Sequence, residues 1–147
     1  MKTVRDVIAE KSLQNLITIS STASVVDAAD LMKQWDVGAL LVMQGDRLAG
    51  LVTERDCMRA CVATGHLPAV VQVDEVMNPT PQVVAADKTT EECMALMTHL
   101  RVRHLPVVWA GDVPGLVSIG DLVKDVLDDR SFLIEQLEAY IVGSPSA

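Results

Sequence analysis

The stretch that decides the fold occurs twice, first as Gly50-Leu51-Val52-Thr53-Glu54-Arg55-Asp56 and again, 65 positions later, as Gly115-Leu116-Val117-Ser118-Ile119-Gly120-Asp121. At the same offset, five apolar residues of the first copy fall on apolar residues of the second: Leu31, Met32, Val37, Leu40 and Val42 on Leu96, Met97, Val102, Leu105 and Val107. Self-similarity at a fixed offset indicates a duplicated structural unit. The chain is therefore interpreted as two copies, with material beyond Asp128 that has no counterpart in the first copy.

The sequence pattern of each copy predicts strands and helices in the order β-α-β-β-α. Short apolar runs at residues 16–19 and 82–84 predict a first strand. Ser24-x-x-Asp27 and Thr89-x-x-Glu92 resemble capping boxes, which predicts helices from there to about Trp35 and Leu100. Strands separated by Gly-Asp turns are then expected at 39–43 and 48–52, and at 104–109 and 113–117. A second helix closes each copy, near 54–63 and 119–127.

The chain divides into three parts. Residues 1–68 form the first repeat with a lead-in helix, 69–128 the second repeat, and 129–147 a C-terminal helix and tail. The segment 65–68 is the expected linker, and residues 73–77 resemble the lead-in segment 4–8. Phe132, Leu133, Leu137, Tyr140 and Ile141 have helical spacing, so the C-terminal helix is expected to dock on an apolar surface. The fold class is α/β (α+β).

The amino-acid composition limits the classes of function that the chain can have. Of the 147 residues, 50% are apolar and 22% charged, which is typical of a well-buried globular chain. The net charge of −8 argues against nucleic-acid binding but leaves a small anionic ligand open. No apolar run reaches the roughly 18 residues that span a bilayer, and residues 1–12 do not resemble a signal peptide. Three cysteines make no disulfide framework, so a cytoplasmic protein is expected.

The repeated (Thr/Ser)-x-x-Asp has two interpretations. Thr53 and Ser118 can be helix N-caps, with Asp56 and Asp121 completing the first turn. From the same position each carboxylate can accept hydrogen bonds from both hydroxyls of a ribose. The helix N-terminus beside it favours a phosphate. The two interpretations are compatible, since one structure can serve both.

The doubled Gly-Leu-Val-(Thr/Ser)-x-x-Asp, the β-α-β-β-α order and the strand Leu105-Pro106-Val107-Val108 resemble a tandem pair of CBS (cystathionine β-synthase) domains. The resemblance covers residues 4–128. It implies two repeats packed through their sheets into a pseudo-twofold module, with adenosyl ligands such as AMP, ATP or S-adenosylmethionine in two clefts. It also implies a regulatory role, signalling to a separate effector, and pairing of two modules into a homodimer. NAD is a further candidate ligand.

The resemblance also implies site residues. In one cleft Thr53 and Asp56 would hold the ribose, with Arg55 beside them; in the other cleft Ser118 and Asp121 would do so. The adenine would lie against the strand backbone at 38–40 and 103–105, and the segments 18–19 and 83–84 would complete the walls. The resulting ligand-binding set is Thr18, Gly38, Ala39, Thr53, Arg55, Asp56, Val83, Arg103, His104, Leu105, Pro106, Ser118 and Asp121. Arg103 and His104 would meet phosphate in the second copy only, because the first has Gly38 and Ala39 there.

Three functions remain open at this point. The first is a nucleotide-binding regulatory module without catalytic activity, and the second is a structural interaction module whose clefts bind nothing. The third is a thiol switch or enzyme using Cys57 and Cys61, although buried cysteines are the better explanation. No catalytic constellation or metal site stands out. Arg59 and Lys124 are expected to form ion pairs with Asp56 and Asp121, and His99 to lie on an exposed helix face.

Overall fold

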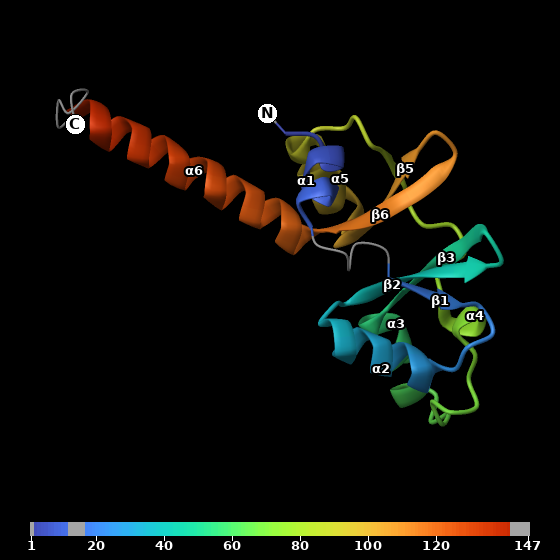
Figure 1. Cartoon of the computed structure of the whole chain (residues 1–147). Helices are drawn as coiled ribbons and strands as arrows, with labels where there is room; N and C mark the ends of the chain where they lie inside the picture. The colour runs from blue at the N-terminus through green and yellow to red at the C-terminus, as the bar shows by residue number, and fades with distance from the viewer. Residues whose placement is uncertain (1, 12–16, 142–147) are drawn as a thin grey trace.

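The computed structural model describes residues 2–11 and 17–141 and contains two three-stranded sheets, one in each repeat (Figure 1). The first sheet has the order β1 (Thr18–Ser20), β2 (Ala39–Gln44), β3 (Arg47–Thr53), and the second β4 (Val84–Ala85), β5 (His104–Trp109), β6 (Asp112–Ser118). The first strand runs parallel to the second, and the second antiparallel to the third. The helices of the repeats are α2 (Val25–Trp35), α3 (Glu54–Val62), α5 (Thr90–Leu100) and α6 (Ile119–Ile141). The predicted order β-α-β-β-α is confirmed in both repeats.

Equivalent residues begin and end the helices of the two repeats. The Ser24 hydroxyl accepts the backbone N–H of Asp27 at the start of α2, and the Thr89 hydroxyl accepts that of Glu92 at the start of α5. Both helices end at a residue in the left-handed region, Asp36 (φ 53°) and Arg101 (φ 57°). These positions lie 65 apart, so the duplication extends to the backbone conformation that stops each helix.

Two short lead-in helices, α1 (Val4–Glu10) and α4 (Val73–Val76), are exchanged between the repeats. The sequence places α1 with the first repeat, but Val4, Val7 and Ile8 pack into the core of the second, beside Leu105 and Leu122. Conversely, Val73 belongs to the core of the first repeat. Backbone hydrogen bonds secure both helices, from Val4 N–H to the carbonyl of Lys88 and from Val73 N–H to that of Ala23.

The glycine shared by the two motifs makes room for the exchanged segments. A Cβ at Gly50 would lie 2.5 Å from the carbonyl oxygen of Asn78, which follows α4. A Cβ at Gly115 would lie 3.0 Å from the side chain of Ile8 in α1. Each glycine therefore permits a close approach that a side chain would block.

The two repeats meet through their sheets. Leu41 and Leu51 of the first sheet form a small apolar cluster to which Val113 and Leu116 of the second contribute. Successive residues of a strand face opposite sides, so Leu40 and Val42 point instead to the helices of the first repeat. The clusters thus form three layers, with the two helical cores outside and the sheet–sheet contact between them.

The final helix differs from its prediction. Residues 119–127 and the C-terminal segment were expected as separate helices, but α6 is one continuous helix of 23 residues. Only its first turns pack on the second repeat, and the rest projects away from both repeats (Figure 1). The expected docking of this end on an apolar surface is wrong within the described chain, because Leu133, Leu137 and Ile141 are exposed.

Candidate functional site

In the first repeat, Thr53 and Asp56 form a reciprocal pair at the start of α3. The N–H of Thr53 donates to Oδ2 of Asp56 at 2.9 Å, and the N–H of Asp56 donates to the Thr53 hydroxyl at 3.1 Å. Among the described residues Oδ1 of Asp56 has no hydrogen-bond partner. The carboxylate is therefore a helix cap that keeps acceptor capacity for a ligand.

In the second repeat, Ser118 and Asp121 repeat this geometry at the start of α6. The N–H of Ser118 donates to Oδ2 of Asp121 at 2.8 Å, and the N–H of Asp121 to the Ser118 hydroxyl at 3.1 Å. Here a cation is added: the Lys11 ammonium lies 2.9 Å from Oδ2 of Asp121 and 2.9 Å from the carbonyl oxygen of Leu116. The two equivalent sites therefore differ in charge.

Lys11 is the residue that sequence reasoning missed. Asp121 was expected to pair with Lys124 on its own helix, but its ion pair is with Lys11, which follows α1. A second lysine, Lys2 at the other end of α1, pairs with the buried Asp125 at 3.0 Å, so α1 is held to α6 by two ion pairs one turn apart. A basic residue beside a short helix gives no local signal of such a contact, because the contact depends on the exchange of α1.

Residues of both repeats converge at the start of β5. The His104 ring approaches Gly38 of the first repeat: a Cβ at Gly38 would lie 3.6 Å from its Nε2 and 3.3 Å from Oε1 of Glu54. In each repeat a backbone hydrogen bond joins the residue before the middle strand to the first residue of the last helix. The N–H of Glu54 donates to the Gly38 carbonyl in the first repeat, and the N–H of Ile119 donates to the Arg103 carbonyl in the second. The predicted residues Gly38, His104 and Asp121 are therefore close to the junction between the repeats.

The His104 imidazole is sensitive to pH. Burial lowers its pKa from the ordinary 6.5, the Lys11 and Arg103 cations act in the same direction, and the Asp121 carboxylate opposes them. The unfolded chain therefore takes up a proton at a higher pH than the folded chain, so stability falls as the pH drops through 6.5.

We expect the melting temperature of the wild-type chain to fall more between about pH 7.5 and about pH 5.5 than that of His104→Gln. Thermal unfolding followed by circular dichroism at a series of pH values checks this. Parallel curves for the two proteins would contradict the assignment.

The other predicted site residues fall into two groups, one with buried and one with solvent-exposed side chains. The side chains of Ala39, Leu105 and Pro106 are buried, so they can offer a ligand only backbone atoms. Arg55, Arg103 and Thr18 are exposed, and Val83 is 36% exposed. Of the predicted set, the half-buried polar side chains at the two helix starts are Thr53, Asp56, Ser118 and Asp121, with His104 beside the last.

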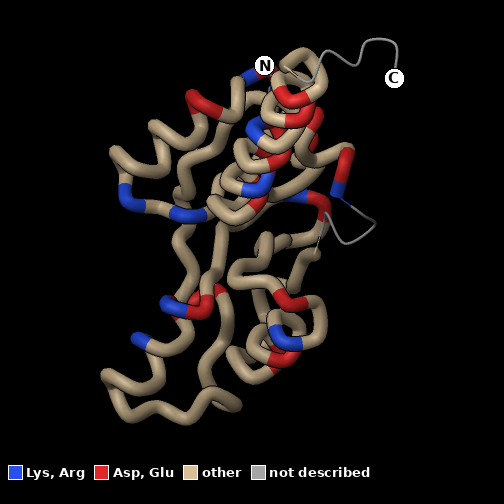
Figure 2. The backbone as a smooth tube through the Cα atoms, turned by 90° about the vertical axis from the view of Figure 1, so that its left-hand side faces the viewer, with Lys and Arg blue, Asp and Glu red and all other residues tan. Residues whose placement is uncertain are grey.

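Lys and Arg are interspersed with Asp and Glu over both repeats in the view of Figure 2. In this view the described residues show no continuous basic stripe of the kind that tracks a phosphate backbone. In the part of the chain that is described, no helix is long and apolar enough to cross a bilayer.

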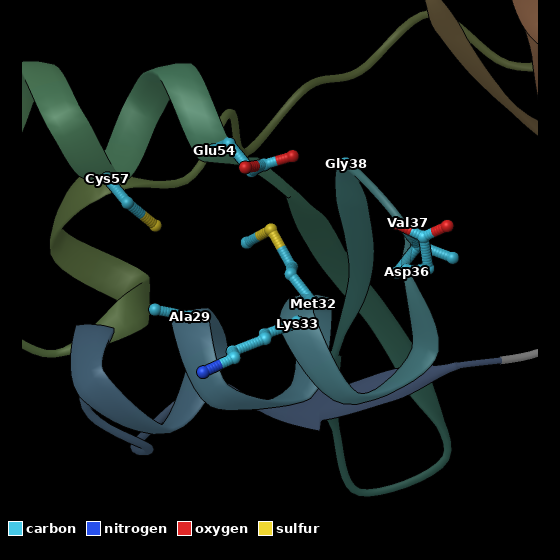
Figure 3. A pocket seen from close by; sticks show the side chains of 8 residues that line it. All are labelled: Ala29, Met32, Lys33, Asp36, Val37, Gly38, Glu54 and Cys57. Atoms are coloured by element: carbon cyan, nitrogen blue, oxygen red, sulfur yellow. The ribbon is translucent and has the colours of Figure 1, made fainter.

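A cavity of about 540 Å³ lies between α2, α3 and the start of β2 (Figure 3). The Cys57 thiol and the Met32 thioether point into it, and Lys33, Gly38 and Glu54 also line it. Of the predicted ligand-binding residues only Gly38 lines this space. The cavity is therefore adjacent to the first predicted cleft and distinct from it.

The cysteines are buried, as predicted. Burial raises the pKa of Cys57 to about 11 and that of Cys93 to about 11, so both thiols stay protonated and poorly nucleophilic near neutral pH. His99 is exposed on α5, also as predicted. Residues 2–11 and 17–141 hold no group of three or more His, Cys, Asp or Glu side chains arranged to bind a metal ion.

Two β-α-β-β-α repeats that exchange lead-in helices, each presenting a carboxylate at the start of its last helix, define a duplicated module with two related sites. The CBS domain family model matches residues 4–63 and 73–128, and the chain belongs to this family.

Several relatives are similar over most of the chain. A CBS domain-containing protein of Bacillus subtilis, YhcV, is 30% identical over 89% of this chain and 90% of its own length. The mitochondrial CBSX3 protein of Arabidopsis thaliana is 36% identical over 82% of this chain, which spans 61% of that protein. The solved structure of a signal-transduction protein with CBS domains from Burkholderia ambifaria is 43% identical, with a TM-score of 0.83 over 87% of this chain and 96% of the other. A hexameric CBS-CP12 protein from cyanobacteria is 30% identical, with a TM-score of 0.72 over 83% of this chain and 66% of the other.

Proposed function

We propose that this chain is a regulatory module that binds an adenine nucleotide such as AMP, ATP or NAD in the clefts between its repeats and catalyses no reaction. The supporting observation is the pair of carboxylates, Asp56 and Asp121, each fixed by its own helix start with one oxygen unpaired among the described residues. Such an oxygen can accept hydrogen bonds from ribose hydroxyls. The free, buried cysteines agree with a cytoplasmic location, which is part of the proposal.

The two clefts are expected to differ in their preference for phosphate. Lys11 and His104 lie beside Asp121 and Arg103 precedes His104, whereas the first cleft has Gly38 and Ala39 at the positions of Arg103 and His104 and gains only Arg55, whose equivalent in the second repeat is Gly120. A phosphorylated ligand is therefore expected to bind more tightly in the second cleft than in the first.

The second cleft also offers a path for a signal. A ribose whose two hydroxyls bind both oxygens of Asp121 would compete with Lys11 for Oδ2, and Lys11 adjoins α1 while Asp121 belongs to α6. Ligand binding would thus weaken one of the two ion pairs that hold α1 to α6. A ligand shifts a conformational equilibrium only if it contacts the two states differently. A ligand on Asp121 meets this condition, because Lys11 shares the carboxylate in one state and not in the other. The output would pass to a separate effector protein or through a homodimer; the hexameric CBS-CP12 relative is a precedent for self-association.

A structural interaction module with non-binding clefts is the second candidate. In its favour, Asp56 and Asp121 already serve as caps, and the 540 Å³ cavity lies outside the predicted ribose sites. A thermal-shift series with AMP, ATP, NAD and S-adenosylmethionine distinguishes the two, with inorganic phosphate as the control. The proposed function predicts a rise in melting temperature with at least one adenosyl ligand and little with phosphate. No rise at several millimolar of any of them would favour the structural module.

A further inference from the structure

Lys11 gives the second repeat a cation where the first repeat has a neutral donor. The Lys11 ammonium donates to Oδ2 of Asp121 and to the carbonyl oxygen of Leu116, both at 2.9 Å. Leu51 is the equivalent of Leu116 in the first repeat, and its carbonyl oxygen accepts the backbone N–H of Asn78 at 2.9 Å. The two repeats therefore differ in the group that reaches this carbonyl from the exchanged lead-in segment.

Only two of the three donors of the Lys11 ammonium meet acceptors among the described residues. An ammonium group has three N–H donors, and here two of them point to Asp121 and Leu116. The side chains of Lys11 and Asp121 are 30% and 22% exposed, so both are accessible from solvent. A ligand that reaches the carboxylate therefore also reaches the ammonium.

For a ribose without a phosphate, Lys11 is a competitor. An ionised carboxylate oxygen accepts about two hydrogen bonds, and Oδ2 of Asp121 already accepts the Ser118 N–H at 2.8 Å and the Lys11 ammonium. A ribose that donates from both hydroxyls therefore has to displace Lys11 from Oδ2. A neutral nucleoside offers no anion in return, so the ion pair is lost when it binds.

A phosphate on the same ribose changes this balance. A phosphate monoester carries about two negative charges at neutral pH and accepts charge-assisted hydrogen bonds, which are roughly twice as strong as neutral ones. Lys11 can turn from Oδ2 of Asp121 to the phosphate, because a lysine side chain is long and flexible. The ammonium then keeps an anionic partner, and Oδ2 becomes available to the ribose hydroxyl.

We propose that Lys11 makes the second cleft selective for a phosphorylated adenine nucleotide over the nucleoside, by occupying Asp121 in the empty cleft and moving to the phosphate in the filled one. This inference rests on the nucleotide binding proposed above and adds the residue that sets the selectivity. Among the described residues no cation forms an ion pair with Asp56, so the first cleft lacks this device.

Titrations of the full chain with AMP and with adenosine, followed by amide ¹H–¹⁵N spectra, test the selectivity. Residues 118–122 report the dissociation constant of each ligand at the second cleft. Lys11→Met should weaken AMP about 10-fold and tighten adenosine about threefold, so the ratio of the two constants falls about 30-fold. Lys11→Arg keeps a cation at this position and should keep the ratio within about threefold of the wild-type value.

Two controls separate the role of Lys11 from a general effect on α1. Lys2→Gln removes the cation at the other end of α1, where Lys2 pairs with Asp125 at 3.0 Å, and its amide can still donate to that carboxylate. This variant should leave the ratio unchanged. In the same spectra, residues 53–57 report the first cleft, where Lys11→Met should not alter the ratio.

Each outcome supports or overturns the selectivity. If both ligands bind and Lys11→Met leaves their ratio unchanged, the inference fails while the proposed nucleotide binding stands. The same fall in Lys2→Gln or in Lys11→Arg as in Lys11→Met would also overturn it, because the effect would then come from a loosened α1 or from side-chain shape instead of charge. Spectra that neither ligand changes at several millimolar would overturn the proposed function and this inference together.

Discussion

Replacing Asp121 with alanine is expected to abolish most of the rise in melting temperature that an adenine nucleotide gives the wild-type chain. At a ligand concentration 100 times Kd, binding stabilises a folded chain by about 2.7 kcal/mol. For a chain of this length that is a rise of about 5–11 °C. The Asp121→Ala variant should show less than about 2 °C, because the ribose loses its acceptor.

Because Asp121 also caps α6 and pairs with Lys11, the ligand-free Asp121→Ala variant will itself melt at a lower temperature. Each shift is therefore measured against the same variant without ligand. Asp27→Ala is the matched control, since Asp27 caps α2 by the same reciprocal hydrogen bonds with Ser24 but lies at the start of a different helix. It should lose about 1 kcal/mol of stability and retain the full ligand-induced rise. A full rise in Asp121→Ala would leave the carboxylate with a structural role only.

A double substitution in the lead-in helix, Val4→Ala with Ile8→Ala, is expected to destabilise the second repeat although both residues precede the first. Val4 is fully buried and Ile8 is 7% exposed, and both pack with Leu105 and Leu122. Truncating a buried Ile to Ala costs about 2–5 kcal/mol, and loss of two methyl groups at Val4 adds to this. A total of about 4–6 kcal/mol is comparable with the whole stability of many domains.

The two tryptophans let urea unfolding distinguish the halves, because Trp35 ends α2 in the first repeat and Trp109 ends β5 in the second. The unfolding midpoint seen by Trp109 should fall in the double variant, with that of Trp35 falling by the same amount or less. Val73 lies in α4, which packs into the first repeat. Val73→Ala should therefore lower the unfolding midpoint seen by Trp35 more than the midpoint seen by Trp109. An unchanged midpoint in the double variant, or a larger effect on Trp35 than on Trp109, would contradict the exchanged packing.

The sequence predicts the strands and helices of each repeat well, because their signals are local. Alternation along β2 and β5 marks the strands, and Ser24 and Thr89 mark the helix starts. The prediction of two separate C-terminal helices overlooked that no Gly or Pro interrupts residues 121–141. Asp128, Asp129 and Ser131 are residue types that can cap a new helix, so the absence of Gly and Pro favours one continuous helix without deciding it.

The exchange of α1 and α4 could not be predicted in the same way. Val4, Val7 and Ile8 have a helical period that fits either repeat, and the choice depends on contacts with residues about 80–120 positions away. The Lys11–Asp121 ion pair depends on that exchange and was missed for the same reason. At the candidate site the sequence thus predicts the repeated residues and the unmatched Arg103 and His104, whereas the Lys11 cation beside Asp121 comes from the tertiary structure.

A titration with AMP followed by amide ¹H–¹⁵N correlation spectra tests whether a nucleotide binds at the starts of α3 and α6. Binding there predicts that the largest shifts occur at residues 118–122, with weaker ones at residues 53–57, and that the shifts saturate with increasing AMP. Unchanged spectra at several millimolar AMP, or shifts confined to the cavity around Met32 and Lys33, would contradict it.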